Sequence, residues 1–371
     1  MRFGDYQDDW SKTTYRDICW TFSGGTPNSH DTRFYNGDIP FIKSGEISSP
    51  FTEQFLTEEG IKSSAAKMVK KGDLLLALYG ATSGQIAISK IDGAINQAVL
   101  CIRSNENIGF IMYAWQSSVE RILSTYLQGG QGNLSAEIVK RLPIWIPKKD
   151  EQERIATFMT LLDRRIEVQN KIIEDLISIE KLIIDHVFGQ QATDSLSAFI
   201  SEINERNKAE EPLDVYSVSN RLGFIPQSEQ FEDKEIASNN KQHYKIATNS
   251  TFAYNPARIN VGSIGFYSGR KPVIVSPMYV CFKVHGIDPL VLQQFFSSKA
   301  FYKEMSSKLE GSVRQCLTFQ GMRSIRFHIP QGDDSAWLTI AKAIHKKRTM
   351  EEAILKSFIR QKAYLLSNLF I

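Results

Sequence analysis

The chain has 371 residues, of which 42% are hydrophobic and 23% are charged, and its formal net charge of +3 is mildly basic. This length exceeds one ordinary hydrophobic core and indicates two domains of a globular protein, not a disordered or fibrous chain. No apolar run reaches the about 18 residues that indicate a membrane span. The first ten residues carry three Asp and no apolar stretch, so we expect no signal peptide.

Neither the cysteines nor the histidines indicate a metal site. The four cysteines, Cys19, Cys101, Cys281 and Cys316, form no Cys-x-x-Cys pair, which predicts a reducing, cytoplasmic location and no zinc ribbon. The six histidines are scattered along the chain, which argues against another metal centre. A phosphate-binding GxxxxGK[ST] loop and a nucleophile elbow are both absent, so we expect neither ATP hydrolysis nor catalytic residues in this chain.

The first predicted domain covers residues 1–147. Its Ser23–Asn28 segment is a dense turn, and the paired glycines within it permit close approach of the backbone to a partner. A helix is expected over 108–127, then a Gly-rich loop at 128–133 and a short helix over 134–141. The other expected elements are a short amphipathic element at 10–19 and strands at 39–43, 73–79, 85–89 and 94–103.

Residues 148–190 are predicted to form one long helix. Pro147 has a helical φ, Asp150 and Glu151 favour the positive end of the helix dipole, and no Pro or Gly follows until Gly189. Apolar residues recur at alternating steps of four and three, which indicates a coiled coil. The expected seam is Ile155, Leu162, Ile166, Ile173, Leu176 and Ile183. The stripe is expected to be widened by Phe158, Ile172 and Ile179 and interrupted by Gln169 and Glu180.

The second predicted domain, residues 191–330, repeats the first at an offset of roughly 182 residues. Val215–Ser219 corresponds to Phe41–Ser44, and Cys281 corresponds to Cys101. A helix is expected over 290–309 and an irregular loop over 310–318. The last segment, 331–371, repeats the long helix, and its expected seam residues are Ile344, Leu355, Phe358 and Leu365.

The duplication predicts an α+β fold with two pseudo-two-fold-related globular domains separated by two long antiparallel coiled-coil helices. The framework is alike in both halves while the loops differ, which is typical of a recognition device. A pair of such readers on one DNA duplex would contact half-sites about one helical turn apart.

Polar side chains gather in the loops and at the strand ends of both domains, where Asn and Gln can pair with adenine and Arg with guanine. In the first domain we expect DNA contacts at Gly24, Gly25, Thr26, Pro27, Asn28, Lys43, Ser44, Tyr79, Thr82, Ser83, Asn96, Gln97, Gln131 and Asn133. In the second domain we expect them at Asn220, Arg221, Asn255, Arg258, Asn260, Arg314 and Gln315. The residues expected to hold phosphates are Lys67, Lys70, Lys71, Lys140, Arg141, Arg323 and Arg326.

Several short motifs resemble those of one family. They are Ser23–Pro27, Asn36–Phe41, Gly72–Leu75, Ile95–Gln97, Leu142–Pro147 and, most specifically, Glu151–Ala156. Over nearly its whole length the chain resembles the specificity subunit of type I restriction-modification systems. The second half departs from this pattern, since it has neither the Gly-Gly-Thr-Pro turn nor the Glu-Gln-Glu-Arg run.

The resemblance implies two target-recognition domains, each reading one half of a bipartite DNA site, and two helices that set the spacer. It implies that two modification subunits dock on the helices and methylate adenine with S-adenosylmethionine. A restriction subunit using ATP and Mg joins them in some systems. The chain itself is then non-catalytic and holds no cofactor.

Two other functions stay open from the residues. One is a structural coiled-coil scaffold that binds protein partners without reading DNA, against which the polar loops argue. The other is an enzyme with a degenerate site, because Tyr254–Ala257 is similar to the Asn-Pro-Pro-aromatic box of amino-methyltransferases. That segment lacks the second Pro and the aromatic residue, so a turn at a strand end is favoured.

Overall fold

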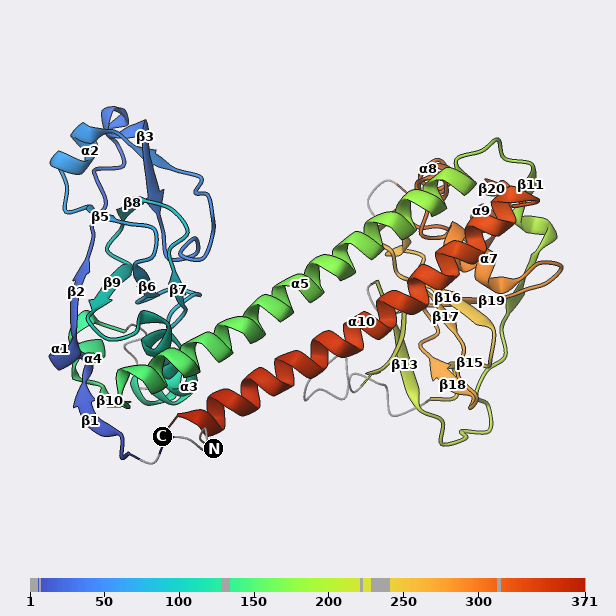
Figure 1. Ribbon diagram of the computed structural model, residues 1–371. Helices are drawn as coiled ribbons and strands as arrows, with labels where there is room; N and C mark the ends of the chain where they lie inside the picture. Colours follow the sequence, from blue (N-terminus) through green and yellow to red (C-terminus); the bar gives the residue numbers. More distant parts are fainter. Residues whose placement is uncertain are drawn as a thin grey trace. The chain divides into compact units, whose positions relative to one another are not determined.

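The structure, a computed structural model, describes residues 6, 8–127, 134–220, 223–227, 241–311 and 315–370. It contains two compact units: unit 1 is Met1–Asn170 with Ala353–Ile371, and unit 2 is Lys171–Glu352. Each unit holds a globular region and one half of each long helix, α5 (Lys149–Phe188) and α10 (Asp333–Leu369) (Figure 1). The sequence instead predicts boundaries at the ends of these helices.

Unit 1 contains two four-stranded sheets, in which β3 and β8 are parallel and the other neighbours are antiparallel. The first sheet has the order β2 (Cys19–Ser23), β9 (Val99–Ser104), β6 (Leu74–Ala77) and β7 (Ile86–Ile88). The second has the order β4 (Phe55–Leu56), β3 (Tyr35–Ile42), β8 (Gly93–Ile95) and β5 (Lys67–Val69). A separate ladder pairs β1 (Ser11–Thr14) with β10 (Pro143–Ile146). The helices are α1 (Tyr15–Ile18), η1 (Thr32–Phe34), α2 (Glu58–Lys62), α3 (Ile108–Leu127) and α4 (Ala136–Arg141).

Unit 2 repeats this topology. Its first sheet has the order β12 (Ile200–Ile203), β19 (Val280–Val284), β16 (Thr251–Tyr254) and β17 (Ile264–Tyr267). Its second has the order β14 (Gly223–Pro226), β13 (Val215–Ser219), β18 (Val273–Val275) and β15 (Lys245–Ala247), with β13 and β18 parallel. A ladder pairs β11 (Asp194–Ser195) with β20 (Arg326–Phe327). The helical elements are η2 (Leu196–Ala198), η3 (Ile259–Val261), α7 (Pro289–Phe295), α8 (Lys299–Ser306) and α9 (Phe319–Ser324). The predicted duplication is therefore confirmed strand by strand.

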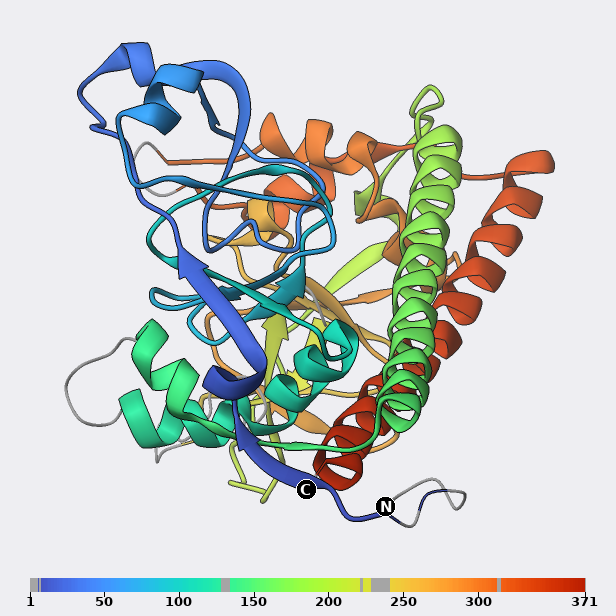
Figure 2. The same ribbon diagram turned by 60° about the vertical axis from the view of Figure 1, so that its left-hand side comes forward.

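The apolar core of unit 1 includes residues from both ends of the chain. All four residues of β6 are buried, as expected for a continuous apolar strand covered on both faces. Trp115 of α3 is fully buried and donates its indole Nε1–H to the Gly84 carbonyl at 2.8 Å. The Trp10 and Phe370 rings meet with centroids 6.4 Å apart, so the end of α10 lies beside the segment that leads into β1 (Figure 2). The last turn of α10 thus packs into the same apolar core as Trp10, which lies near the other end of the chain.

The Glu151–Ala156 run fixes the start of α5 within unit 1. Gln152 is fully buried, and its Nε2 donates to the Pro147 carbonyl at 2.9 Å and to Glu106 Oε2 at 2.7 Å. Its Oε1 accepts from the Asn107 backbone N–H at 3.0 Å. The buried Gln152 of the most specific family motif therefore joins the start of α5 to the start of α3, while Glu153 and Arg154 of the same motif are exposed.

Two sequence predictions are wrong because local polar groups compete with regular structure. The predicted helix over 290–309 is two helices, since Ser298 Oγ donates to the Phe295 carbonyl and accepts from the Phe301 N–H. The predicted strand over 94–103 is two strands in different sheets, because Asn96 turns the chain by accepting from the Ala98 N–H. Unit 2 has the same division, since β18 and β19 lie in different sheets. The element expected at 10–19 contains β1, α1 and the start of β2.

The two long helices run antiparallel in each unit. In unit 1, Asp163 of α5 contacts Lys362 of α10 at 2.7 Å, and the Arg165 guanidinium lies 4.5 Å from the Phe358 ring centroid. Residue numbers therefore rise along one helix as they fall along the other. In unit 2, Glu180 Oε1 lies 3.0 Å from His345 Nδ1, and the His186 and Trp337 rings meet at 6.5 Å, again in opposite order.

All ten predicted seam residues are buried or half-buried. Ile155 and Leu365, for example, lie within the core of unit 1. By contrast Phe158, Ile172 and Ile179 are 37%, 37% and 46% exposed, so they do not widen the seam. They stay on the surface of α5 as apolar side chains. None of the helices among the described residues is both long and apolar enough to cross a membrane.

Candidate nucleic-acid interface

Four strands of unit 1 end at one edge of its sheets. β2 and β6 both pair antiparallel with β9, so their carboxyl ends lie beside its first residues, Val99 and Leu100. β3 runs parallel to β8, and residues 96–98 lead from β8 directly into β9. The loops that follow these strands therefore gather together. We call residues 24–28, 43–46, 79–84 and 96–98 the unit 1 loop edge.

Gly24 and Gly25 are required by the packing of the chain against itself. A Cβ at Gly24 would lie 1.7 Å from the Ile95 carbonyl oxygen, and one at Gly25 would lie 2.7 Å from Ala65 Cβ. Pro27 is buried, and its carbonyl accepts from the Tyr35 hydroxyl at 2.8 Å. These three predicted contact residues build the turn, whose exposed side chains are Thr26 and Asn28.

Thr26, Tyr79 and Gln97 come together from three different loops. Thr26 Oγ1 donates to Gln97 Oε1 at 2.6 Å, and Gln97 also bonds the Tyr79 hydroxyl. Burial raises the pKa of Tyr79. Thr26 and Gln97 are exposed and Tyr79 is half-buried, so this polar cluster lies at the surface of the loop edge.

The remaining predicted residues of unit 1 serve partly as turn formers. Ser83 Oγ donates to the Leu78 carbonyl at 3.0 Å, and the Thr82 carbonyl accepts from the Gln85 N–H at 3.0 Å. The Lys43 N–H donates to Glu46 Oε2 at 3.1 Å, and Ser44, within the same turn, is half-buried. These contacts hold the loops in place.

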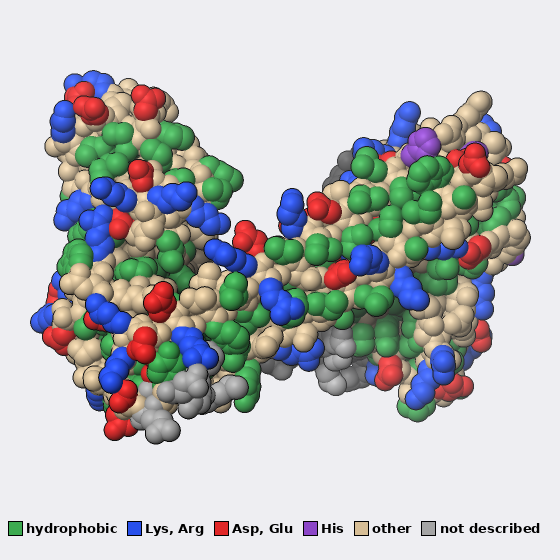
Figure 3. Space-filling model, in the orientation of Figure 1, with side chains coloured by type: hydrophobic (Ala, Val, Ile, Leu, Met, Phe, Trp, Pro, Cys, Tyr) green, Lys and Arg blue, Asp and Glu red, His purple; other side chains and the backbone are tan. Residues whose placement is uncertain are grey.

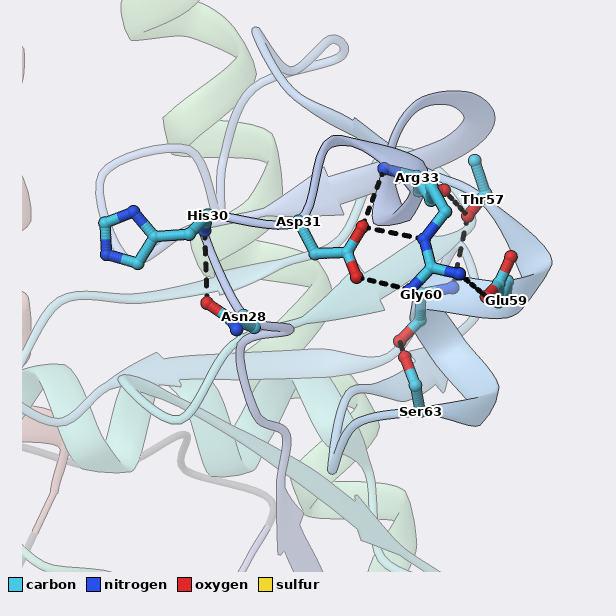
Figure 4. A network of polar contacts seen from close by, with 8 residues as sticks. All are labelled: Asn28, His30, Asp31, Arg33, Thr57, Glu59, Gly60 and Ser63. Atoms are coloured by element: carbon cyan, nitrogen blue, oxygen red, sulfur yellow. Dashed lines mark hydrogen bonds and ion pairs between the residues drawn. The ribbon is translucent and has the colours of Figure 1, made fainter.

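A polar network stabilises the chain beyond Asn28 (Figure 4). Asp31 accepts from the Arg33 backbone N–H, Nε and Nη2 at 3.2, 3.0 and 2.7 Å. The hydrogen bonds from the Arg33 side chain lower the pKa of Asp31 below its ordinary value. Arg33 Nη1 also lies 3.6 Å from Glu59, and Asn28 Oδ1 accepts from the His30 N–H at 3.1 Å. The exposed Asn28 is thus held in a defined position.

Leu134, the first described residue after α3, lies at the same edge. The Leu134 N–H donates to the Leu78 carbonyl at 2.9 Å, beside Tyr79. Gln131 and Asn133, which precede it, lie outside the described residues. Lys67 opens β5 opposite Ile95, is exposed, and places its Nζ 5.6 Å from the Phe22 ring centroid. Among the predicted phosphate-binding residues that the structure describes, Lys67 therefore lies beside the unit 1 loop edge.

Other predicted phosphate-binding residues have partners within the chain. Lys140 Nζ lies 2.8 Å from Glu137, and Arg326 Nη2 donates to the Ala192 and Thr193 carbonyls at 3.2 and 3.4 Å. These contacts favour a structural role for both cations.

Unit 2 has an equivalent loop edge, residues 220, 255–263, 276–279 and 315–317. Asn220 is exposed directly after β13, and Arg258 and Asn260 are exposed after β16. Asn255 is buried, and its Oδ1 accepts from the Ala257 N–H at 3.0 Å, so it forms the turn.

A second contact places Gln315 close to that turn. The Leu317 N–H donates to the Pro256 carbonyl at 3.0 Å, the counterpart of the Leu134–Leu78 bond in unit 1. Gln315, two residues earlier, is exposed. Arg221 and Arg314 lie outside the described residues.

Sequence reasoning missed Met278. It lies in the turn between β18 and β19, which corresponds to the turn between β8 and β9 that carries Gln97, and it is 59% exposed. Matching the two turns around the corresponding cysteines, Cys101 and Cys281, aligns Pro277 with Gln97 and Met278 with Ala98. The two loop edges therefore share a framework and differ in the side chains they present. Among the described residues no cluster of His, Cys, Asp or Glu could hold a metal ion.

Comparison with known proteins agrees with this architecture. A sequence model of the type I restriction modification DNA specificity domain matches residues 7–177. The MjaIX specificity subunit of a type I restriction enzyme from Methanocaldococcus jannaschii is 26% identical over 189 residues, 47% of this chain and 43% of that protein. The MjaVIII specificity subunit from the same organism is 23% identical over 203 residues, 53% of this chain and 46% of that protein. The chain thus spans less than half the length of these curated relatives.

Two solved structures share the fold along nearly the whole chain. The S subunit of a type I restriction-modification system from M. genitalium has a TM-score of 0.62 at 15% identity, covering 98% of this chain and 96% of that one. A chain from a structure on complex assembly and conformational transition of the type I system has a TM-score of 0.58 at 14% identity, covering 97% of both. The predicted fold class, two like globular halves with two long antiparallel helices, is confirmed.

Proposed function

Because the chain belongs to the family of type I restriction-modification specificity subunits, we propose that it is the non-catalytic DNA-recognition subunit of such a complex. The observation that carries this proposal is the pair of loop edges, which repeat one strand topology and present different side chains. Each edge reads one half of a bipartite site. Residues 1–147 and 191–330 are then the two target-recognition domains, and 148–190 and 331–371 are the spacer helices.

The helices also provide a docking surface for two modification subunits. Val168, Leu182 and Met350 are 58%, 70% and 60% exposed, and they lie outside the seam. Hydrophobic side chains recur along the surface that these helices form (Figure 3). Exposed apolar side chains in such number are typical of a protein–protein contact. Phe158, Ile172 and Ile179 of α5 are also exposed and lie outside the seam.

The chemistry then belongs to the partner subunits. S-adenosylmethionine binds in the modification subunits, which methylate adenine, and ATP and Mg bind in a restriction subunit where one is present. This chain holds the DNA in place and carries no cofactor.

Footprinting of the complex between this chain and its modification subunits tests the proposal. We expect two protected patches on DNA about one helical turn apart, at a bipartite sequence. The purified chain alone, given S-adenosylmethionine and that DNA, should transfer no methyl group. Uniform, sequence-independent protection would instead favour a scaffold, and methyl transfer by the chain alone would show that it is an enzyme.

A further inference from the structure

In the cluster of Thr26, Gln97 and Tyr79, the Gln97 carboxamide has its oxygen toward the Thr26 hydroxyl. Thr26 Oγ1 donates to Gln97 Oε1 at 2.6 Å, so the carboxamide oxygen already has its partner. Gln97 bonds the Tyr79 hydroxyl oxygen through its amide nitrogen, a contact that by itself acts to lower the Tyr79 pKa. A carboxamide nitrogen carries two N–H groups, so one of them stays free of both contacts.

A tyrosine hydroxyl is protonated at neutral pH, and burial, the larger effect on Tyr79, raises its pKa further. Its O–H is therefore a donor. The cluster offers two donors to a partner, the second N–H of Gln97 and the O–H of Tyr79. Gln97 is exposed and Tyr79 is half-buried, so both groups lie at the surface of the unit 1 loop edge.

Building on the proposed function, we propose that Gln97 and Tyr79 read a guanine in the first half-site and that Thr26 is a positioning residue. Guanine presents two acceptors in the major groove, N7 and O6, which match two donors. Adenine and cytosine each present an amino donor there, and thymine places a methyl group beside its one acceptor. Without the Thr26 hydroxyl, the Gln97 carboxamide could flip, and its oxygen could then accept from the amino group of adenine or cytosine instead.

Unit 2 does not repeat this cluster. Its corresponding turn carries the apolar Met278, and the hydroxyl of the neighbouring Tyr279 accepts from the Val218 N–H at 3.3 Å. The place of Tyr79 beyond β16 is taken by Ala257. The second half-site is therefore an internal control for every substitution in the cluster.

The first test uses the full chain assembled with its modification subunits and a DNA pool randomised in both half-sites. Thr26→Val keeps the side-chain shape and removes the hydroxyl, so we expect the preference for guanine at one position of the first half-site to fall about tenfold. Thr26→Ser retains the hydroxyl and should select as the wild type does. The second half-site should be unchanged in both variants.

The second test reverses the hydrogen-bond polarity. In Gln97→Glu, one carboxylate oxygen still accepts from Thr26 while the other faces the DNA as an acceptor. We expect guanine to be rejected in favour of adenine or cytosine, whose amino groups can donate. Gln97→Met should remove the preference at that position without replacing it.

Several results would overturn the inference. They are a first half-site without guanine, a Thr26→Val motif as sharp as the wild type, or a Gln97→Glu complex that still selects guanine. If the Thr26→Val complex selects neither half-site, the variant has failed to fold. The Gln97→Met variant, which changes an exposed position, then tests the inference. A wild-type complex that selects no sequence contradicts the proposed function itself, which separates the two failures.

Discussion

Asp73 and Arg103 form a bidentate ion pair in unit 1. Arg103 Nε and Nη2 donate to the two carboxylate oxygens at 2.8 and 2.5 Å, and the side chains are 13% and 34% exposed. Burial alone would raise the pKa of Asp73, but the Arg103 hydrogen bonds and the Lys70 N–H outweigh it, and the pKa lies below its ordinary 3.8. Because the pKa is lowered on folding, the pair stabilises the fold above about pH 4, and this stabilisation is lost as pH falls further.

Asp73→Asn should therefore lower the free energy of unfolding by about 1–2 kcal/mol at pH 7, since Arg103 is partly exposed. Urea unfolding of the wild type and the variant at pH 7 and at pH 3 measures this. The difference should shrink at pH 3, which lies below the ordinary pKa of 3.8, because the carboxyl of the unfolded chain is mostly protonated there. An equal difference at both pH values would show that the charge of Asp73 contributes nothing.

In unit 2, Met278 follows Pro277, the counterpart of Gln97, and presents an exposed side chain in the same turn. An exposed apolar side chain at a DNA-reading edge suits the C5-methyl group of thymine. Met278→Ala should weaken a thymine preference in the second half-site by about 1 kcal/mol, or roughly fivefold, and leave the first half-site unchanged. Selection from a randomised DNA pool measures both halves at once. A change confined to the first half-site would refute the assignment of the two edges.

At the scale of the element, two polar contacts occupy equivalent places in the helix pair. Asp163 contacts Lys362 in unit 1, and Glu180 contacts His345 and Arg348 in unit 2. At the offset of roughly 182 residues, Asp163 corresponds to His345 and Glu180 corresponds to Lys362. The acidic residue nevertheless lies on α5 in both contacts. The contacts thus distinguish α5 from α10 and favour pairing of unlike helices over pairing of like ones.

Lys362→Glu would place a second carboxylate beside Asp163. We expect it to lower the free energy of unfolding by about 1–2 kcal/mol, and Asp163→Lys in the same chain should restore most of the loss. Thermal unfolding of the wild type, both single variants and the double variant gives the coupling energy. Lys356→Glu, at an exposed position of α10, is the matched control. Additive effects in the double variant would show that the pair is not coupled.

The elements differ in how well the sequence predicts them. Both long helices and α3 follow from apolar periodicity and from breaks at Pro and Gly, and the repeat of one strand order in both units follows from the duplication. The division of α7 from α8 depends on one capping serine within an apolar run. The role of Gly24 and Gly25 depends on which distant backbone they meet, Ile95 and Ala65, and no local pattern contains that information.

At the scale of the whole molecule, the proposed function gives the helices the role of setting the spacer. Seven residues inserted into α5 alone would offset its seam from that of α10 by about 10 Å and should weaken assembly. Matched insertions in both helices should lengthen the spacer by roughly three base pairs and leave each half-site sequence unchanged. Methylation motifs of the variants measure this, and altered half-site sequences would contradict the division of roles.

The central claim is that two loop edges on one duplicated framework read two halves of one DNA site. Sequencing of methylated DNA from cells that express this chain with its modification subunit tests it most directly. The account predicts adenine methylation at one bipartite motif of fixed spacing, with Gln97→Met altering only one half and Met278→Ala only the other. A continuous motif, or one in which either substitution alters both halves, would contradict it.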